Sequence, residues 1–207
     1  MTPAKRALDL FFAALLICLL WPLIIGIAIT AWLSQGRPIL YVSERMKTES
    51  EAFQMWKFRT MRVAEDDSGV SGGDKDRRIT KFGAFLRATR LDELPQLWNI
   101  IRGDLSFVGP RPPLRQYVDR FPELYASVLR SRPGVTGLAS LRLHRFEEKV
   151  LSGCNSPEET DAVYIRRCIP RKAKLDLLYQ RNHTLCFDFL LAIETIGTLF
   201  RRAKRRQ

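Results

Sequence analysis

The sequence predicts an α+β fold, mainly helical with short strands, behind an N-terminal membrane segment. The run from Leu10 to Leu33 carries no ionisable group except the thiol of Cys18, and about 20 apolar residues are enough for a helix to cross a bilayer. Further along the chain, apolar residues recur mostly at helical spacing, and stretches of β-like composition are short. Because the chain has 207 residues, we expect one principal domain, 37–207, behind an anchor at 1–36.

The anchor carries a proline, Pro22, near its centre. A proline inside a helix removes a backbone donor and costs about 3 kcal/mol, although membrane helices tolerate it. Basic residues flank the run on both sides, and the positive-inside rule draws both flanks to the cytoplasm. These residues are Lys5, Arg6, Arg37, Arg45 and Lys47.

If the chain bends at Pro22, each arm reaches about 18 Å, a little over half of a ~30 Å hydrocarbon core. A re-entrant, proline-broken helix and a kinked spanning helix therefore both fit the anchor. A signal peptide does not, because its apolar region is limited to about 15 residues and no cleavage site follows the run.

The net charge of +12, from 34 Lys and Arg against 22 Asp and Glu, favours partners rich in phosphate. Nucleic acid, anionic lipid and phosphorylated substrates all qualify, and the apolar segment favours lipid. We expect no nucleic-acid partner, because the charge suggests one but no binding motif accompanies it. Four cysteines without a CxxC pair and two histidines give no basis for a zinc site, and reduced thiols predict a cytoplasmic domain.

Two short strands and a loop are expected after the anchor. Ile39–Val42 has a β-like composition, and Phe53–Val63 alternates apolar and basic residues like a strand or a strand–helix junction. Ala64–Arg78 is rich in Gly, Ser and Asp and is predicted to be a loop, either a flap over a site or a plain surface loop. Its acids do not match the calcium-loop pattern, so calcium is not expected.

Helical spacing covers Ile79–Asp104 on both sides of Asp92. Pro95 is tolerated only in a first helical turn, so a new helix should begin between Leu91 and Leu94. Gly103 should end it, and the stretch LSFVGPRPP then indicates a short strand that runs into a rigid proline turn.

The C-terminal third alternates helices with polar breaks. Its last helix, Phe187–Phe200, is apolar on most faces and runs into the tail RRAKRRQ, which has five basic residues. Two interpretations fit this pattern. The helix lies in the membrane interface with its tail drawn to anionic lipid, or it docks on the core and the tail is disordered.

The adjacent acids Asp92 and Glu93 are the main candidates for chemistry. Carboxylates are favoured in a first helical turn, and Thr89-x-x-Asp92 loosely resembles a capping box, so a purely structural role accounts for most such pairs. Several basic residues lie near this pair in the sequence, which predicts a low pKa for Asp92 and hence an ionised carboxylate. The basic residues are Lys57, Arg59, Arg87, Arg90, Arg102 and Arg111.

An ionised carboxylate can hold Mg²⁺ or attack phosphorus, and basic side chains can bind phosphate oxygens. Other phosphate-handling and hydrolytic motifs are missing: the sequence has no Walker A loop, no GxGxxG after a strand, no HExxH and no GxSxG.

Four motifs resemble the bacterial sugar transferase family, the monotopic phosphoglycosyl transferases that start glycan assembly on a polyprenyl carrier. They are KFRTM at 57–61, LDELPQLWN at 91–99, GDLSFVGPRP at 103–112 and RPGVTG at 132–137. Their order and spacing also agree, and the chain is similar in length to the small, single-domain members. The resemblance implies that the anchor is a re-entrant helix broken at a proline with both ends in the cytoplasm. Small members often have Ser before that proline, where this chain has Trp21.

The resemblance also implies a reaction. Asp92 matches the family's nucleophile, which attacks the sugar-bearing phosphate of a UDP-sugar, releases UMP and passes the phosphosugar to polyprenyl (undecaprenyl) phosphate. Mg²⁺ is implied as cofactor, with Asp92 and Glu93 as its ligands. The implied phosphate and nucleotide contacts are Lys57, Arg59, Arg87 and Arg111, with Pro110 and Pro112 shaping the turn that presents Arg111. The implied location is the inner leaflet of the bacterial cytoplasmic membrane, with the catalytic domain on the cytoplasmic face.

The segment 138–170 departs from the family pattern. Many members continue the PG[IV]TG motif with WAQVNGR, whereas this chain reads LASLRLHRF, so the sugar donor stays open. Lys172, Lys174, Asp176 and Tyr179 are similar to a later K...D..Y pattern. The alternative function is a non-catalytic membrane adaptor that binds anionic lipid. The intact acid pair argues against it, because a decayed enzyme could lose both acids without unfolding.

Overall fold

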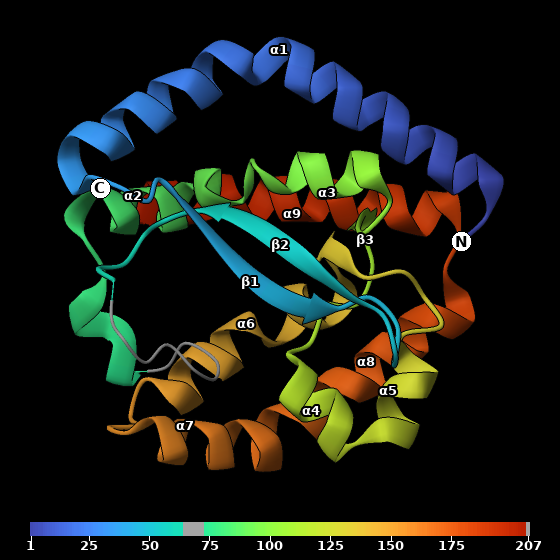
Figure 1. Ribbon diagram of the computed structural model, residues 1–207. Coiled ribbons are helices and arrows are strands. Elements are labelled where there is room, and N and C mark those ends of the chain that lie inside the picture. Colours follow the sequence, from blue (N-terminus) through green and yellow to red (C-terminus); the bar gives the residue numbers. More distant parts are fainter. Residues whose placement is uncertain (64–72, 206–207) are drawn as a thin grey trace.

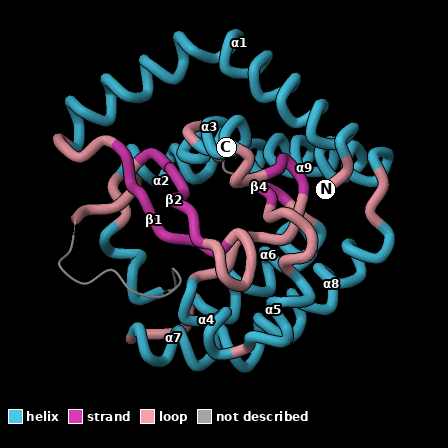
Figure 2. The backbone as a smooth tube through the Cα atoms, turned by 45° about the vertical axis from the view of Figure 1, so that its right-hand side comes forward, coloured by secondary structure: helices cyan, strands magenta, loops and turns pink. Residues whose placement is uncertain are grey.

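Helix α1, Pro3–Gln35, arches over the rest of the molecule in the computed structural model, which describes residues 1–63 and 73–205 (Figure 1). Beneath the arch lies a layer that contains α2 (Lys81–Thr89), α3 (Gln96–Arg102) and α9 (Leu185–Arg205), as Figures 1 and 2 show. The remaining helices lie on the far side of that layer. Thr2 starts α1 by accepting a hydrogen bond from the backbone of Lys5, and Gly36 ends it at a φ of 68°, where glycine is favoured.

The expected break at Pro22 is a bend inside one continuous helix. α1 runs through Pro22 without interruption and arches near its middle (Figure 1). A proline costs a helix one hydrogen bond and bends it, so the two arms expected on either side of Pro22 are joined in one bent helix. The buried residues of α1 fall into two groups at four-residue spacing, one near each end: Lys5, Asp9 and Ala13, then Ile27 and Ala31.

Both ends of α1 are held by the same domain. At the N-terminal end, Lys5 Nζ donates hydrogen bonds to the carbonyl oxygen of Val108 at 2.8 Å and to the hydroxyl of Tyr179 at 3.1 Å. At the C-terminal end, the guanidinium of Arg59 donates to the carbonyl oxygen of Gly36 at 3.0 Å. Within the described residues, α1 is the one helix long and apolar enough to cross a membrane, and it leaves the domain and returns to it.

The strands form two small sheets. β1 (Leu40–Met46) and β2 (Ala52–Phe58) are an antiparallel hairpin, and β3 (Ser106–Val108) pairs in parallel with β4 (Gly134–Thr136). β1 is longer than predicted, and β2 ends at Phe58 rather than Val63. The expected loop or flap, Ala64–Arg78, is described only in part: residues 73–78 form a short 3₁₀ helix, and residues 64–72 lie outside the described residues.

The acid pair lies on a 3₁₀ turn, Leu91–Glu93, that joins α2 to α3. The expected helix starts later than predicted, because α3 begins at Gln96 with Pro95 just before it. The predicted capping box is also wrong: the Thr89 hydroxyl donates to a carbonyl of α2 rather than accepting from the turn. The turn places both acids beside the end of β2.

A close backbone contact fixes α2 against the segment after β2. A Cβ atom at Gly83 would lie 2.0 Å from the carbonyl oxygen of Thr60, so only glycine fits there. Around this contact, Phe58, Leu86 and Ile27 form a buried cluster that joins β2, α2 and α1. The hairpin, the acid-bearing turn and the anchor are therefore packed as one unit.

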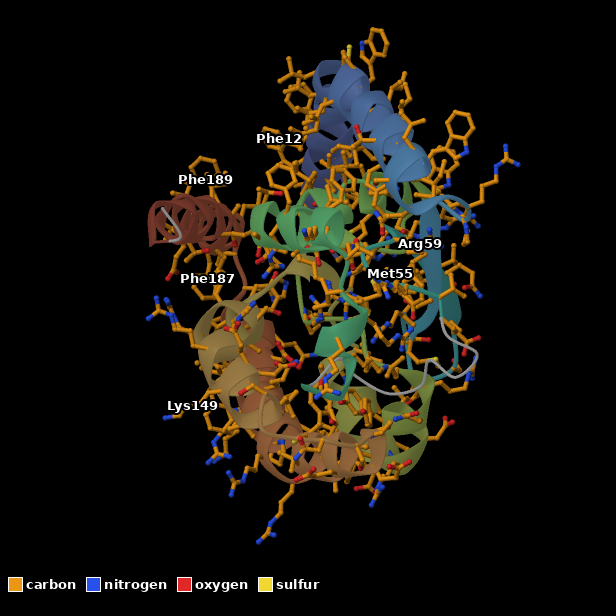
Figure 3. All side chains as sticks on the ribbon, turned by 90° about the vertical axis from the view of Figure 1, so that its left-hand side faces the viewer. Phe12, Met55, Arg59, Lys149, Phe187 and Phe189 are labelled. Carbon is orange, nitrogen blue, oxygen red and sulfur yellow. The ribbon has the colours of Figure 1, made fainter. Side chains whose placement is uncertain are left out.

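α9 has a core face and an exposed apolar face. Phe187 packs beside Val108 and Tyr179, whereas Phe189 is 61% exposed. Figure 3 shows the two rings on opposite sides of α9, with Phe189 on the side from which α1 rises. The docked and interfacial interpretations of this helix thus each describe one face, and the basic side chains of its tail lie outside the described part.

The far-side helices complete the domain. They are α4 (Arg115–Arg120), α5 (Pro122–Val128), α6 (Leu138–Leu151), α7 (Pro157–Val163), a π-helical turn (Tyr164–Cys168) and α8 (Ile169–Asn182).

Candidate active site

Glu93 lies among three cationic side chains. Its Oε1 atom accepts a hydrogen bond from Lys57 Nζ at 2.9 Å, and its Oε2 atom accepts one from Arg90 Nη1 at 3.1 Å. Arg111 Nη1 lies 3.9 Å from Oε1. Burial alone would raise the pKa of Glu93, but the charges of these three partners outweigh it and hold the pKa well below the usual 4.5. An ionised Glu93 therefore gathers cations from three segments at one point.

Asp92 is buried beside this cluster without a partner of its own. It is 8% exposed, and its carboxylate forms no hydrogen bond or ion pair with the described residues. Burial and the charge of Glu93 raise the pKa of Asp92 above the usual 3.8, although Lys57, Arg87 and Arg90 act in the opposite direction. The low pKa that we predicted is therefore wrong, because burial and the like charge of Glu93 outweigh the nearby cations.

Arg87 and Arg90 approach the acids from α2. Arg87 Nε donates to the hydroxyl of Thr60 at 2.9 Å, and its charge lowers the pKa of Asp92. Arg90 has a φ of 60°, the left-handed conformation that non-glycine residues rarely adopt, where the chain turns from α2 into the acid-bearing turn. The sequence named Arg90 as a basic neighbour of the acids but the family resemblance did not imply it as a phosphate contact. Its bond to Glu93 places it in the site.

Arg59 lies away from the acids. Its buried guanidinium donates to the carbonyl oxygens of Gly36 at 3.0 Å and Arg37 at 3.2 Å, and also to that of Gln35. β2 ends at Phe58, so Arg59 does not continue the strand alternation that would place it next to Lys57. The structure therefore brings Arg59 to the C-terminal end of α1 and not to the cluster.

The proline turn after β3 brings Arg111 to Glu93. Pro110 and Pro112 are both buried, and the Pro110 carbonyl oxygen accepts a hydrogen bond from the backbone of Gly134 at 2.9 Å. A Cβ atom at Gly109 would lie 2.2 Å from the carbonyl oxygen of Arg132, so the turn packs directly on the segment before β4. These contacts fix the backbone on both sides of Arg111.

The divergent segment 138–170 contributes Glu147 and Tyr164, which the sequence did not reveal, next to Lys172 of α8. Lys172 Nζ on α8 donates to Glu147 Oε2 at 2.9 Å and to the Tyr164 hydroxyl at 3.2 Å. Burial lowers the pKa of Arg111, but the charges of Glu93 and then Glu147 are among those that raise it above its usual value. Tyr164 lies in the π-helical turn, an irregularity that often marks functional sites. No local motif points to these residues, apart from the weak K...D..Y likeness.

The whole chain follows the pattern of one family. The family described as "Bacterial sugar transferase" matches residues 1–202. The chain belongs to this family. The match includes α1, the acid-bearing turn and the proline turn, so the bacterial sugar transferase fold accounts for the anchor and the site together.

Several members of the bacterial sugar transferase family are similar in sequence. The chain is 36% identical over 166 residues to the UDP-glucose:undecaprenyl-phosphate glucose-1-phosphate transferase of Escherichia coli (strain K12), over 78% of this chain and 36% of that protein. A protein of the same name from Caulobacter vibrioides is 43% identical over 200 residues, which are 94% of this chain and 69% of the relative. The UDP-N-acetylgalactosamine-undecaprenyl-phosphate N-acetylgalactosaminephosphotransferase of Aeromonas hydrophila is 30% identical over 201 residues, 94% of this chain and 43% of the relative.

The chain spans about a third of the length of the Escherichia coli relative. The names of these relatives specify different sugars, glucose in two and N-acetylgalactosamine in the third. Sequence similarity to the family therefore leaves the sugar of this protein undefined.

The donor set at the acid pair suits a magnesium ion held partly by substrate. Among the described residues there is no group of three or more His, Cys, Asp or Glu side chains that could form a complete metal cage. Mg²⁺ is commonly bound through one or two carboxylates together with substrate phosphates. Both oxygens of Glu93 face cations, so Asp92 has the carboxylate oxygens that remain open to a metal.

Proposed function

We propose that this protein transfers a sugar 1-phosphate from a UDP-sugar to polyprenyl phosphate and releases UMP. One observation carries the proposal. The buried carboxylate of Asp92 has no partner in the described part of the chain, and it lies next to Glu93, which gathers Lys57, Arg90 and Arg111. Family membership and the names of the relatives support the same reaction class.

The transfer proceeds in two displacement steps at one phosphorus atom. A carboxylate oxygen of Asp92 attacks the phosphorus that bears the sugar, the bond to the bridging oxygen breaks, and UMP leaves with the electron pair. A phosphate oxygen of polyprenyl phosphate then attacks the same phosphorus. The bond between Asp92 and phosphorus breaks, the carboxylate is regenerated, and the product is a polyprenyl diphosphate sugar. A covalent intermediate divides one difficult encounter into two easier ones.

The cations bind and orient the phosphates. Arg111 is 38% exposed at its side chain, and Arg87 lies beside Asp92, so both can reach phosphate oxygens. Lys57 is held by Glu93 at 2.9 Å, which fixes its ammonium group before substrate arrives. Asp92 and the substrate phosphates would hold Mg²⁺. When bound, the ion would neutralise part of the phosphate charge.

We place the domain at the cytoplasmic face of the bacterial inner membrane, with α1 entering and leaving the same leaflet. Two features support this placement: the middle of α1 is exposed and apolar while both its ends bind the domain, and α9 exposes a row of apolar side chains. That row is Phe189, Leu190, Ile193 and Ile196. An amphipathic helix of this kind lies in the interface plane.

The decisive experiment measures UMP release in detergent with Mg²⁺, polyprenyl phosphate and a panel of UDP-sugars. The wild type should release UMP with at least one donor, and Asp92→Asn should not. Exchange of labelled UMP into the UDP-sugar without acceptor isolates the first step and reports the intermediate. The assignment of Asp92 fails if Asp92→Asn catalyses exchange at a rate near that of the wild type.

The membrane placement has its own test. In a protein with Cys18 and Cys186 replaced by serine, single cysteines at Ala4 or Ser34, both exposed, should react with an impermeant maleimide from the cytoplasmic side only. Pro22→Ala restores a helix donor and straightens a helix of 33 residues, long enough to span the bilayer. Labelling of residue 4 from the outside should then increase. Outside labelling in the unaltered background would rule out the re-entrant placement.

A further inference from the structure

A cavity of about 190 Å³ lies next to the charged cluster. Its walls come from α1, α3, α9 and the strands β3 and β4, and most of its lining is aliphatic or aromatic, including Leu16 of α1 and Phe107 of β3. Arg90 and Glu93 form the charged part of the wall. The cavity thus joins an apolar space, with the membrane helix as one wall, to the edge of the candidate site.

Some hydrogen-bond donors of the Arg90 guanidinium at this cavity are not used by the described residues. Its Nη1 atom donates to Glu93 at 3.1 Å, and its Nε and Nη2 atoms form no hydrogen bond within the described part of the chain. The side chain is 25% exposed. A guanidinium with open donors binds phosphate oxygens in a defined geometry, so the charged wall can receive an anionic group.

The apolar part of the cavity is lined on one side by the apolar helix α1. Leu16 lies one helical turn beyond Phe12, which is 42% exposed. Figure 3 shows Phe12 on the flank of α1 nearest α9, and Phe189 on the α1 side of α9. An apolar chain that passes between these two helices would therefore stay in contact with apolar side chains.

We propose that this cavity binds the first isoprene unit of a polyprenyl phosphate, with the lipid phosphate at Arg90. The inference deepens the proposed function and rests on it for the identity of the acceptor. An apolar cavity of about 150 Å³ is large enough to hold benzene, so this one suits a single isoprene unit. A UDP-sugar is polar throughout and does not match the apolar lining, whereas a prenyl phosphate has one apolar and one doubly anionic end.

Thr195 of α9 provides the test. It lines the cavity and its hydroxyl lies 2.9 Å from that of Thr136. Thr195→Phe should fill the cavity, and Thr198→Phe adds the same ring one turn later on the same helix, at a residue that does not line it. Thr195→Val keeps the shape but loses the hydroxyl, which separates filling from loss of the hydrogen bond.

The first readout is binding of farnesyl phosphate, measured by calorimetry on the full chain in phosphatidylcholine nanodiscs. The Kd should rise about tenfold in Thr195→Phe, the change expected when one apolar group is excluded, and stay near the wild-type value in Thr198→Phe and Thr195→Val. Farnesol and inorganic phosphate should each bind more weakly than farnesyl phosphate. If Thr195→Phe unfolds, Thr195→Leu replaces it in the same comparison.

Two results would overturn the inference. One is an equal Kd for Thr195→Phe and Thr198→Phe. The other is loss of farnesyl phosphate binding when the nanodiscs contain phosphatidylglycerol, because the cavity would then be a general site for anionic lipid.

The second readout separates this inference from the proposed function. In Thr195→Phe, acceptor-dependent transfer should fall about tenfold relative to acceptor-independent UMP exchange. If the wild type shows no exchange with any donor but Thr195→Phe still weakens farnesyl phosphate selectively, the proposed reaction fails and the cavity assignment stands. If exchange is present but neither binding nor the transfer-to-exchange ratio changes, the cavity assignment fails and the reaction stands.

Discussion

The two halves of the candidate site differ in how their charge is balanced. On one side, Glu93 accepts hydrogen bonds from Lys57 and Arg90 and lies near Arg111, and its pKa is depressed. On the other side, Asp92 is buried without a partner among the described residues, and its pKa is raised. Adjacent carboxylates on one short turn thus have opposite environments. Glu93 positions the cations, and Asp92 keeps its oxygens open to a ligand.

The two environments make opposite contributions to stability. Because the pKa of Asp92 is raised, its protonated form stabilises the fold below its usual pKa of 3.8, and this contribution is lost as the pH rises through the raised value. Because the pKa of Glu93 is lowered, its contribution is present above the usual 4.5 and is lost as the pH falls through the lowered value. At neutral pH, Glu93 therefore stabilises the fold and Asp92 opposes it.

The largest effect is expected from Asp92→Asn. Loss of a nucleophile should reduce UMP release by roughly 10⁴-fold or more, while the midpoint of thermal unfolding at neutral pH should be unchanged or higher, because the unfavourable buried charge is gone. Asp119→Asn, at an exposed acid on α4, is the control and should retain both properties. A large drop in the unfolding midpoint of Asp92→Asn would contradict the contrast between the two acids.

Glu93→Gln should affect both properties. The change leaves the largely buried ammonium of Lys57, whose side chain is 15% exposed, and the guanidinium of Arg90 without their anion. The free energy of unfolding should therefore fall by about 3–5 kcal/mol. Transfer should fall roughly 100-fold, because the cations lose their fixed positions. Urea unfolding and UMP release measure the two effects, with the exposed Glu123→Gln as control. Stability equal to that of Asp92→Asn would refute the organising role of Glu93.

Asp176 extends the comparison to a third buried carboxylate. Burial raises the pKa of Asp176 to about 7, and Lys172 offsets only part of that rise. Since a raised pKa means that ionisation opposes folding, Asp176→Asn should increase the free energy of unfolding above pH 7 by up to about 4 kcal/mol. The gain should shrink as the pH falls through about 7 toward 4. Unfolding curves at several pH values check this, and a pH-independent difference would contradict it.

The smallest effect concerns the acid side of the pH profile. UMP exchange needs an ionised Asp92, so its rate should fall as the pH drops through the raised pKa of that residue. The charge of Glu93 contributes to that rise, and Glu93→Gln should therefore move the acid limb to lower pH. A limb that moves to higher pH would show that the cations freed by the substitution no longer reach Asp92.

Local features of this fold were predictable because they depend on neighbouring residues. The helical class, the strand near Ile39–Val42, the short strand before the proline turn and the long anchor all follow from apolar periodicity and turn residues. Errors occurred where distant packing intervenes. β2 ends at Phe58 because the chain then packs under α2. The helix after the acids begins only at Gln96 because the preceding residues form a tight turn.

The site shows the same division. The sequence by itself determined the acid pair, the basic motifs and the proline turn, since these are local strings of residues. Only the tertiary structure decided that Lys57 and Arg111 meet Glu93 and that Arg59 goes to the end of α1. It also decided that Asp92 is buried with no partner in residues 1–63 and 73–205. The physical reason is that these partners come from segments far apart in the chain. Their distances, their burial and hence the sign of each pKa shift exist only once β2, the acid-bearing turn and the proline turn pack together.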